Sequence, residues 1–191
     1  RHVSCMAEKG RFRKKGHLRI KVISMGEGQV GKSCLIKRHC EHKFVSKYIP
    51  TIGVDYGVRP VHIDETLVKI NFWDLSGNPE YFEIRNEFYK DAQGVLLVFD
   101  VTDRKTFTAL EAWLKEAAMY SGFVKPLAGI VCGNKADKKK RSVDSAEASA
   151  WAKSQGFTYY ETSAKSGQNV DRAFETLFND VIDQLEKLSQ L

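Results

Sequence analysis

The residues with the clearest chemical meaning form a glycine-rich segment with the spacing G-x-x-x-x-G-K-[ST]. It lies between a run typical of a strand and a run typical of a helix. Glycines let backbone N–H groups surround phosphate oxygens, and a helix N-terminus adds its positive end. We predict that a nucleoside triphosphate binds here, with Lys32 at the β- and γ-phosphates and the Ser33 hydroxyl on Mg²⁺; the alternative is a purely structural turn. The predicted contact residues are Gly26, Glu27, Gly28, Gln29, Val30, Gly31, Lys32, Ser33 and Cys34.

A second group suited to a metal ion is Asp74, which ends the apolar run 70–73. An unpaired carboxylate at the end of a buried strand would be costly, so an acidic residue there is best explained by a nearby cation. We expect Asp74 to approach Mg²⁺ through a water molecule. An ordinary strand-end aspartate in a turn is the alternative.

Two further segments bear on the choice of base. Asn134-Lys135-Ala136-Asp137 follows an apolar run, and the segment 161–165 follows the next short one. An aspartate can accept hydrogen bonds from N1–H and the 2-amino group of guanine, and adenine has neither donor at those positions. We expect the Lys135 stem to lie over the base, Asn134 to tie loops together and the Ala164 N–H to donate to guanine O6. The pattern therefore favours guanine, with contacts from Asn134, Lys135, Asp137, Ser163, Ala164 and Lys165.

Hydrophobic periodicity predicts the elements that position these groups. We expect a hairpin turn at 64–66, which makes the flanking strands antiparallel. Strands that alternate with helices predict an α/β doubly wound sheet with helices on both faces, and ligands bind beyond the carboxyl ends of its strands. The expected strands are 18–25, 54–63, 67–73, 95–99, 127–132 and 158–160, and the expected helices are 32–40, 106–120, 143–155 and 169–188.

Composition indicates one domain without a membrane span. The chain has 191 residues, 42% of them hydrophobic, and a net charge of +6. We expect a basic, flexible segment over 1–17 followed by one domain over 18–191. The basic run 138–141 reads as a solvated loop or, alternatively, as weak attraction to an acidic partner or membrane. The four cysteines lack metal or disulfide spacing, which favours reduced thiols in a cytosolic protein.

Taken together, these motifs resemble a Ras-superfamily small GTPase of the Rab branch, over about 18–188. The resemblance implies a P-loop NTPase (small G protein) fold: a six-stranded, mostly parallel sheet with one antiparallel strand pair. Residues 48–55 resemble a Rab switch I, and 74–91 would be switch II; unidentified effectors and regulators would bind through both. By this resemblance Thr51 would bind Mg²⁺ and the γ-phosphate, and the Gly77 N–H would meet the γ-phosphate. Tyr48 would join the nucleotide contacts, and Phe44 would pack edge-on against guanine unless it is a core aromatic.

The chain is more similar still to the RJL group, Rab-like proteins that carry a J domain. That similarity rests on residues 19–26, 44–48 and 85–91. A J domain would follow Leu191, and a chaperone ATPase would be a partner only in that case. No cysteine follows Cys132, so we expect no lipid anchor in this chain and a cytoplasmic or nuclear location.

One departure from the family concerns catalysis. Where most small GTPases read Asp-Thr-Ala-Gly-Gln-Glu, this chain reads Asp-Leu-Ser-Gly-Asn-Pro-Glu, so Asn78 replaces the glutamine that orients water. Asn78 is one methylene shorter, and Pro79 pushes it toward an extended conformation. We expect a switch that binds GTP and GDP but hydrolyses GTP weakly, with Asn78 and Gly77 at the catalytic position. Arg85 is expected to be a solvated helix charge rather than a catalytic arginine.

Two other functions compete with this one. The first is a scaffold that holds GTP more or less permanently, which nucleotide content after purification would distinguish. The second is a basic GTPase associated with nucleic acid. The chain has no RNA-binding motif and no basic patch interleaved with aromatic residues, so no nucleic-acid partner is expected.

Overall fold

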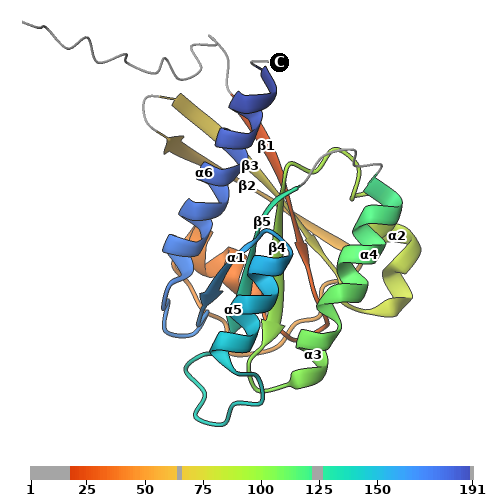
Figure 1. The fold of residues 1–191 in the computed structure, drawn as a ribbon, viewed down its shortest axis with the longest axis vertical. Helices are drawn as coiled ribbons and strands as arrows, with labels where there is room; N and C mark the ends of the chain where they lie inside the picture. Colours follow the sequence, from red (N-terminus) through yellow and green to blue (C-terminus); the bar gives the residue numbers. More distant parts are fainter. Residues whose placement is uncertain (1–17, 64–65, 122–126, 190–191) are drawn as a thin grey trace, which may run out of the picture.

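The computed structural model describes residues 18–63, 66–121 and 127–189. The predicted basic segment 1–17 and residues 64–65 of the predicted hairpin turn lie outside the described residues. Six strands form one sheet in the order β2-β3-β1-β4-β5-β6 (Figure 1). They are β1 (Leu18–Met25), β2 (Val54–Ile63), β3 (Thr66–Leu75), β4 (Gly94–Asp100), β5 (Ala128–Asn134) and β6 (Thr158–Glu161).

Strand pairing follows the expected pattern. Strands β2 and β3 are antiparallel, with Val54 opposite Leu75 and Ile63 opposite Thr66. The other neighbouring strands are parallel. Strand β4 is buried along its whole length, as a continuous apolar run in a parallel sheet requires. The predicted mostly parallel sheet with one antiparallel pair is confirmed.

Helices cover both faces of the sheet (Figure 1). Helices α1 (Lys32–Glu41) and α6 (Val170–Ser189) pack on one face, where Leu35, Phe72 and Phe174 belong to one core cluster. The second cluster lies on the other face and includes Tyr89, Trp113 and Ala148. The helices on that side are α2 (Phe82–Asn86), α3 (Arg104–Thr108), α4 (Leu110–Ser121) and α5 (Ser145–Ser154).

Two local features differ from the expectation. The helix expected over 106–120 is two helices, α3 and α4, and α3 begins after Asp103, whose side chain accepts a hydrogen bond from the Lys105 N–H at 3.0 Å. The 3₁₀ helix η1 (Pro79–Tyr81) and α2 were not predicted, because each is too short to show a periodic apolar stripe.

Within the described part of the chain, none of the helices has the length and apolar content needed to cross a membrane.

Candidate functional site

A pocket of about 490 Å³ lies beyond the carboxyl ends of the parallel strands, where a doubly wound sheet binds ligands. Segments far apart in the sequence meet around it. The predicted residues on its wall are Gly28, Gln29, Gly31, Lys32, Ser33, Cys34, Phe44, Tyr48, Thr51, Gly77, Asn78, Asn134, Lys135, Asp137, Ala164 and Lys165. Gly26, Glu27, Val30, Asp74 and Ser163 do not line it, but each is hydrogen-bonded to a residue that does.

The glycine-rich segment joins β1 to α1, and two of its glycines have backbone angles and close contacts that a larger residue would not tolerate. Gly26 has φ +136°, and a Cβ there would lie 2.2 Å from the Val98 carbonyl oxygen. Gly31 has φ +101°, and a Cβ there would lie 2.3 Å from Nδ2 of Asn134. Both positions therefore need glycine.

Lys32 is the buried cation of this segment. Its Nζ donates to the Gly26 carbonyl at 2.7 Å and to the Glu27 carbonyl at 2.9 Å. Burial lowers the pKa of Lys32 to about 8, and the carboxylates of Asp74 and Glu27 act in the opposite direction. An anion such as phosphate would compensate the charge of an ammonium group in this position.

Three oxygen-bearing side chains converge at the start of α1. The Ser33 hydroxyl donates to Oδ2 of Asp74, and Oγ1 of Thr51 lies 3.1 Å from the Ser33 Oγ. The Thr51 hydroxyl also lies 3.5 Å from Oδ2 of Asp74, whose Oδ1 accepts from Ser24 at 2.6 Å. Hydroxyl and carboxylate oxygens are the ligands that Mg²⁺ prefers. The three residues predicted at the metal are thus neighbours, although their role as metal ligands stays a prediction.

The two loops that are expected to select the base, 134–137 and 161–165, are tied to each other and to the glycine-rich segment. Asn134 donates to the Val30 carbonyl at 2.8 Å and accepts from the Ala164 N–H at 3.2 Å. The Ser163 hydroxyl donates to Asp137 at 2.6 Å. The predicted role of Asn134 in tying loops together is seen directly. The Ala164 N–H, expected to donate to guanine O6, is hydrogen-bonded to Asn134 here.

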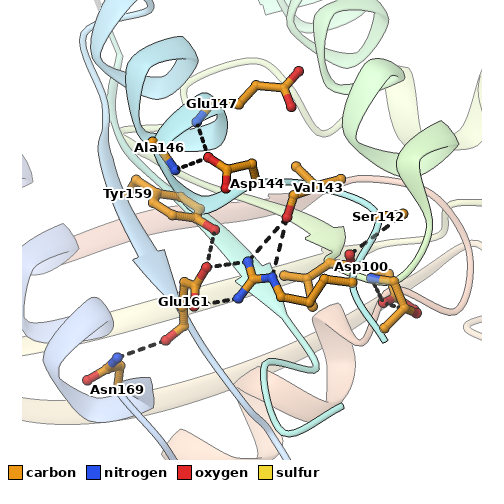
Figure 2. A network of polar contacts seen from close by, with 12 residues as sticks. Asp100, Ser142, Val143, Asp144, Ala146, Glu147, Tyr159, Glu161 and Asn169 are labelled. Carbon is orange, nitrogen blue, oxygen red and sulfur yellow. Dashed lines mark hydrogen bonds and ion pairs between the residues drawn. The ribbon is translucent and has the colours of Figure 1, made fainter. Parts of the chain in front are cut away.

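A further polar network braces the loop after Asp137. Figure 2 shows Glu161 at its centre, with Tyr159 donating to its carboxylate and Asn169 to its backbone carbonyl at 2.8 Å. The partner of Glu161 from the loop is Arg141, whose Nη1 donates at 2.9 Å. The solvated-loop interpretation of 138–141 therefore holds for the three exposed lysines, whereas Arg141 is part of an ion pair.

Residues 44–52, which include the start of the expected switch I, lie along the pocket and are largely open to solvent. Phe44 is 38% exposed and lies on the pocket wall, so the alternative of a core aromatic is wrong. Tyr48 is also exposed and lines the same pocket. Lys135 lines the same pocket with φ +65°, and its ammonium pairs with Asp100 at 2.6 Å.

Gly77 and Asn78 occupy very different environments. Gly77 is buried against the glycine-rich segment, where a Cβ would lie 2.2 Å from the Gly28 nitrogen and 2.3 Å from the Glu27 carbonyl carbon. Asn78 is exposed and extended, with φ −78° and ψ 128°. Its side-chain oxygen accepts from the Glu80 N–H at 3.1 Å and caps η1. The amide is thus used locally, as an N-cap.

Arg85 corrects an expectation. It is not a solvated helix charge, because only 6% of its side chain is exposed and its guanidinium forms a two-pronged ion pair with Glu116, at 2.7 and 2.9 Å. Sequence reasoning missed Glu116 as well. A signal was present, since Glu116 lies one turn from the buried Trp113 and next to the buried Ala117, at the edge of the apolar stripe of α4.

The glycine-rich turn between β1 and α1, the oxygen cluster of Ser33, Thr51 and Asp74, and the two linked loops at 134–137 and 161–165 define a P-loop nucleotide-binding domain of the small-GTPase type. The Ras family model matches residues 21–183, and the chain belongs to the Ras family. Membership in this family indicates a GTP-binding switch. The expected P-loop GTPase fold is confirmed.

Several similar curated proteins are named DnaJ homolog subfamily C member 27. The human protein is 50% identical over 173 residues, which cover 88% of this chain and 63% of the relative. The Danio rerio protein is 48% identical over 183 residues, or 94% of this chain and 67% of the relative. This chain therefore spans about two thirds of the length of these relatives. The predicted similarity to Rab-like proteins with a J domain is confirmed.

Proposed function

We propose that this chain is a guanine-nucleotide switch that binds GTP and GDP with Mg²⁺ and hydrolyses GTP slowly. The observation that carries the proposal is the meeting of both switch segments with the phosphate loop, Thr51 at Ser33 and Gly77 at Gly28. A γ-phosphate would complete both contacts, and its loss would release them.

Each part of the pocket then has a role. The backbone N–H groups of Gly28–Lys32 and the Lys32 ammonium would bind the phosphates. Ser33 and Thr51 would coordinate Mg²⁺ directly and Asp74 through water. The bound ion would neutralise phosphate charge. The base would lie between Phe44 and Lys135, with its donors at Asp137. The remaining nucleotide contacts would come from Tyr48, Asn134, Ala164 and Lys165 on the pocket wall and from Ser163, which is hydrogen-bonded to Asp137.

Slow hydrolysis follows from the position of Asn78. Its side chain caps η1 through Glu80, and Pro79 restrains its backbone. Orienting water would require the amide to leave this cap, and the side chain is one methylene shorter than the glutamine of the family. Positioning errors of about 1 Å cost on the order of 10²-fold in rate. We expect intrinsic hydrolysis at or below roughly 10⁻⁴ s⁻¹.

A single-turnover assay tests this proposal. Protein loaded with GTP and Mg²⁺ should hydrolyse its GTP with a half-life of about two hours or longer, as a rate at or below roughly 10⁻⁴ s⁻¹ requires. Chelation of Mg²⁺ should speed release of the nucleotide. Guanine nucleotides should compete for the site and adenine nucleotides should not, because Asp137 has no donor to accept from at the adenine edge. Rapid unassisted turnover would contradict slow hydrolysis, and binding of ATP with equal affinity would contradict the guanine assignment.

A GTP-bound scaffold is the second candidate, and the capped Asn78 favours it over a rapid cycle. The two differ in the nucleotide found after purification. A scaffold would retain GTP with no conversion to GDP over a day, whereas a slow switch would give a mixture that shifts steadily toward GDP.

Partners would bind the exposed side chains of the two switch segments, including Tyr48, Ile49, Ile52 and Ile84. Effectors and regulators remain to be identified. The name of the relatives contains DnaJ homolog, so a chaperone ATPase would be a partner if a J domain follows Leu191. The proposed location is cytoplasmic or nuclear.

A further inference from the structure

A cluster of five side chains connects switch II and the phosphate loop to helix α4. We call the ion pair at its centre the Arg85–Glu116 latch. Tyr89 adds a hydrogen bond to Oε1 of Glu116 at 2.6 Å. The Arg85 guanidinium stacks on Trp113, 4.3 Å from the ring centroid, and the Trp113 indole donates to the Glu27 carboxylate at 3.0 Å. Helices α2 and α4, which carry Arg85 and Glu116, lie side by side (Figure 1).

The latch is more than a surface ion pair. The side chain of Glu116 is only 14% exposed, and both of its oxygens accept from Arg85. A two-pronged pair between a planar guanidinium and a carboxylate fixes direction as well as distance. Removing one partner would leave the other as a buried, unpaired charge. The Arg85 guanidinium is therefore held in one place on the surface of α4.

Arg85 also contacts the backbone carbonyl groups of the two residues that flank Gly77. Its Nη1 donates to the Asn78 carbonyl at 3.0 Å and lies 3.4 Å from the Ser76 carbonyl oxygen. Gly77 itself is packed on the backbone of Glu27 and Gly28. The Trp113 indole of α4 is hydrogen-bonded to the Glu27 side chain. Helix α4 therefore supports both partners of the contact between Gly77 and the phosphate loop: Gly77 through Arg85, and the phosphate loop through Glu27.

We propose that Arg85, held by Glu116, is a positioning residue that sets the preference for nucleoside triphosphate over diphosphate by fixing the Gly77 N–H at the γ-phosphate. The inference rests on the proposed guanine-nucleotide switch. The diphosphate lacks the group that Gly77 would meet, so loosening the latch weakens triphosphate binding and leaves diphosphate binding nearly unchanged. Exchange of the triphosphate for the diphosphate would then change the contacts of α4 as well as those of switch II.

Glu116→Gln tests the latch, because it keeps the size of the side chain and removes its charge. Dissociation of a fluorescent non-hydrolysable GTP analogue should become roughly tenfold faster, the scale of one lost charged hydrogen bond. Dissociation of fluorescent GDP should change by less than about twofold. Amide hydrogen exchange over residues 76–82 of the triphosphate-bound protein should rise as well.

Glu147→Gln is the matched control. Glu147 forms a two-pronged pair with Arg104, but that pair is exposed and joins α3 to α5, away from Gly77. It should change neither dissociation rate. Arg85→Lys is a second probe, since lysine keeps the charge but lacks the planar fork whose Nε and Nη2 bind both Glu116 oxygens while Nη1 reaches the Asn78 carbonyl. Arg85→Lys carries the test alone if thermal unfolding shows that Glu116→Gln does not fold.

The outcomes separate the two proposals. If the wild-type protein binds neither nucleotide, the proposed function fails and the latch proposal fails with it. If the wild-type protein binds both nucleotides but the latch variants speed release of GDP and the GTP analogue equally, or change neither, only the latch proposal is overturned. Selective loss of the triphosphate in both latch variants, with Glu147→Gln unchanged, supports it.

Discussion

At the scale of single residues, Gly77 shows how tightly switch II approaches the phosphate loop. Gly77→Ala would place a Cβ 2.2 Å from the Gly28 nitrogen and 2.3 Å from the Glu27 carbonyl carbon, and backbone atoms cannot move aside as a flexible side chain can. Overpacking of this kind costs about 1–3 kcal/mol. We expect roughly tenfold or greater loss of affinity for a GTP analogue and a smaller loss for GDP, measured by fluorescence titration.

Gly57→Ala is the control for that substitution. A Cβ at Gly57 in β2 would meet nothing within 4 Å, and its φ lies outside the left-handed region. Its affinities should match those of the wild-type protein. Equal affinity of Gly77→Ala and wild-type protein for the GTP analogue would show that Gly77 does not approach the γ-phosphate.

Asn78 gives a second prediction at this scale. Asn78→Gln restores side-chain length but leaves Pro79, which restrains the backbone and starts η1. Its single-turnover rate should therefore rise by much less than the about 10²-fold that correct positioning can give. Asn78→Gln combined with Pro79→Ala should rise further than either single variant. A large rise from Asn78→Gln alone would show that side-chain length was the obstacle.

The site could be predicted from the sequence where its residues lie close together in the chain. Lys32, Ser33 and Asp137 belong to short motifs, and the spacing within each motif fixes the relative positions of its residues. Arg85 could not be placed in this way, because its partner Glu116 lies 31 residues away on another helix. The capping role of Asn78 depends on the start of η1, which has no periodic signal in the sequence.

At the scale of elements, helix α5 depends on its N-cap residue, Asp144, which follows the loop after Asp137. Asp144 accepts hydrogen bonds from the N–H groups of Ala146 at 2.8 Å and Glu147 at 3.2 Å, as Figure 2 shows. Asp144→Ala should lower the free energy of unfolding by about 1 kcal/mol, measured by urea denaturation. Asp144→Asn, which keeps a side-chain acceptor, should lie within a few tenths of a kcal/mol of the wild-type protein. Equal losses in both variants would mean that the cap is not the cause.

Long elements were predicted better than short ones, for a physical reason. The stripe of apolar residues in α6 spans several turns, and β4 is a continuous apolar run, so both were found within one or two residues of their ends. One helix was expected over 106–120 because the apolar stripe continues across Ala109. In the structure α3 ends at Thr108 and α4 begins at Leu110. Side-chain caps such as those of Asp103 and Asp144 set the actual starts.

At the scale of the whole molecule, the face of the sheet covered by α1 and α6 contains a buried histidine. His39 is 4% exposed, stacks on Phe174 with ring centroids 4.3 Å apart and contacts Oδ1 of Asp171 at 2.8 Å through Nδ1. Its Nε2 is buried without a hydrogen-bond partner among the described residues. Nδ1–H donation to Asp171 leaves Nε2 unprotonated, so a second proton would enter an apolar environment. Burial lowers the pKa of His39 from 6.5 to about 4, and the hydrogen bond to Asp171 opposes this shift only in part.

This histidine makes stability depend on pH in a defined direction. The unfolded chain binds a proton at His39 near pH 6.5, and the folded protein does so only near pH 4. The unfolded state therefore holds more protons between these values, and the free energy of unfolding falls as pH falls through this window, by on the order of 3 kcal/mol. In His39→Asn, which keeps a donor for Asp171 but does not titrate, the slope between pH 5 and 6.5 should largely disappear, whatever the overall loss of stability. His62, exposed on β2, is the control, and His62→Asn should keep the wild-type slope. Urea denaturation at half-unit pH steps measures both, and an unchanged slope in His39→Asn would assign the pH dependence to other groups.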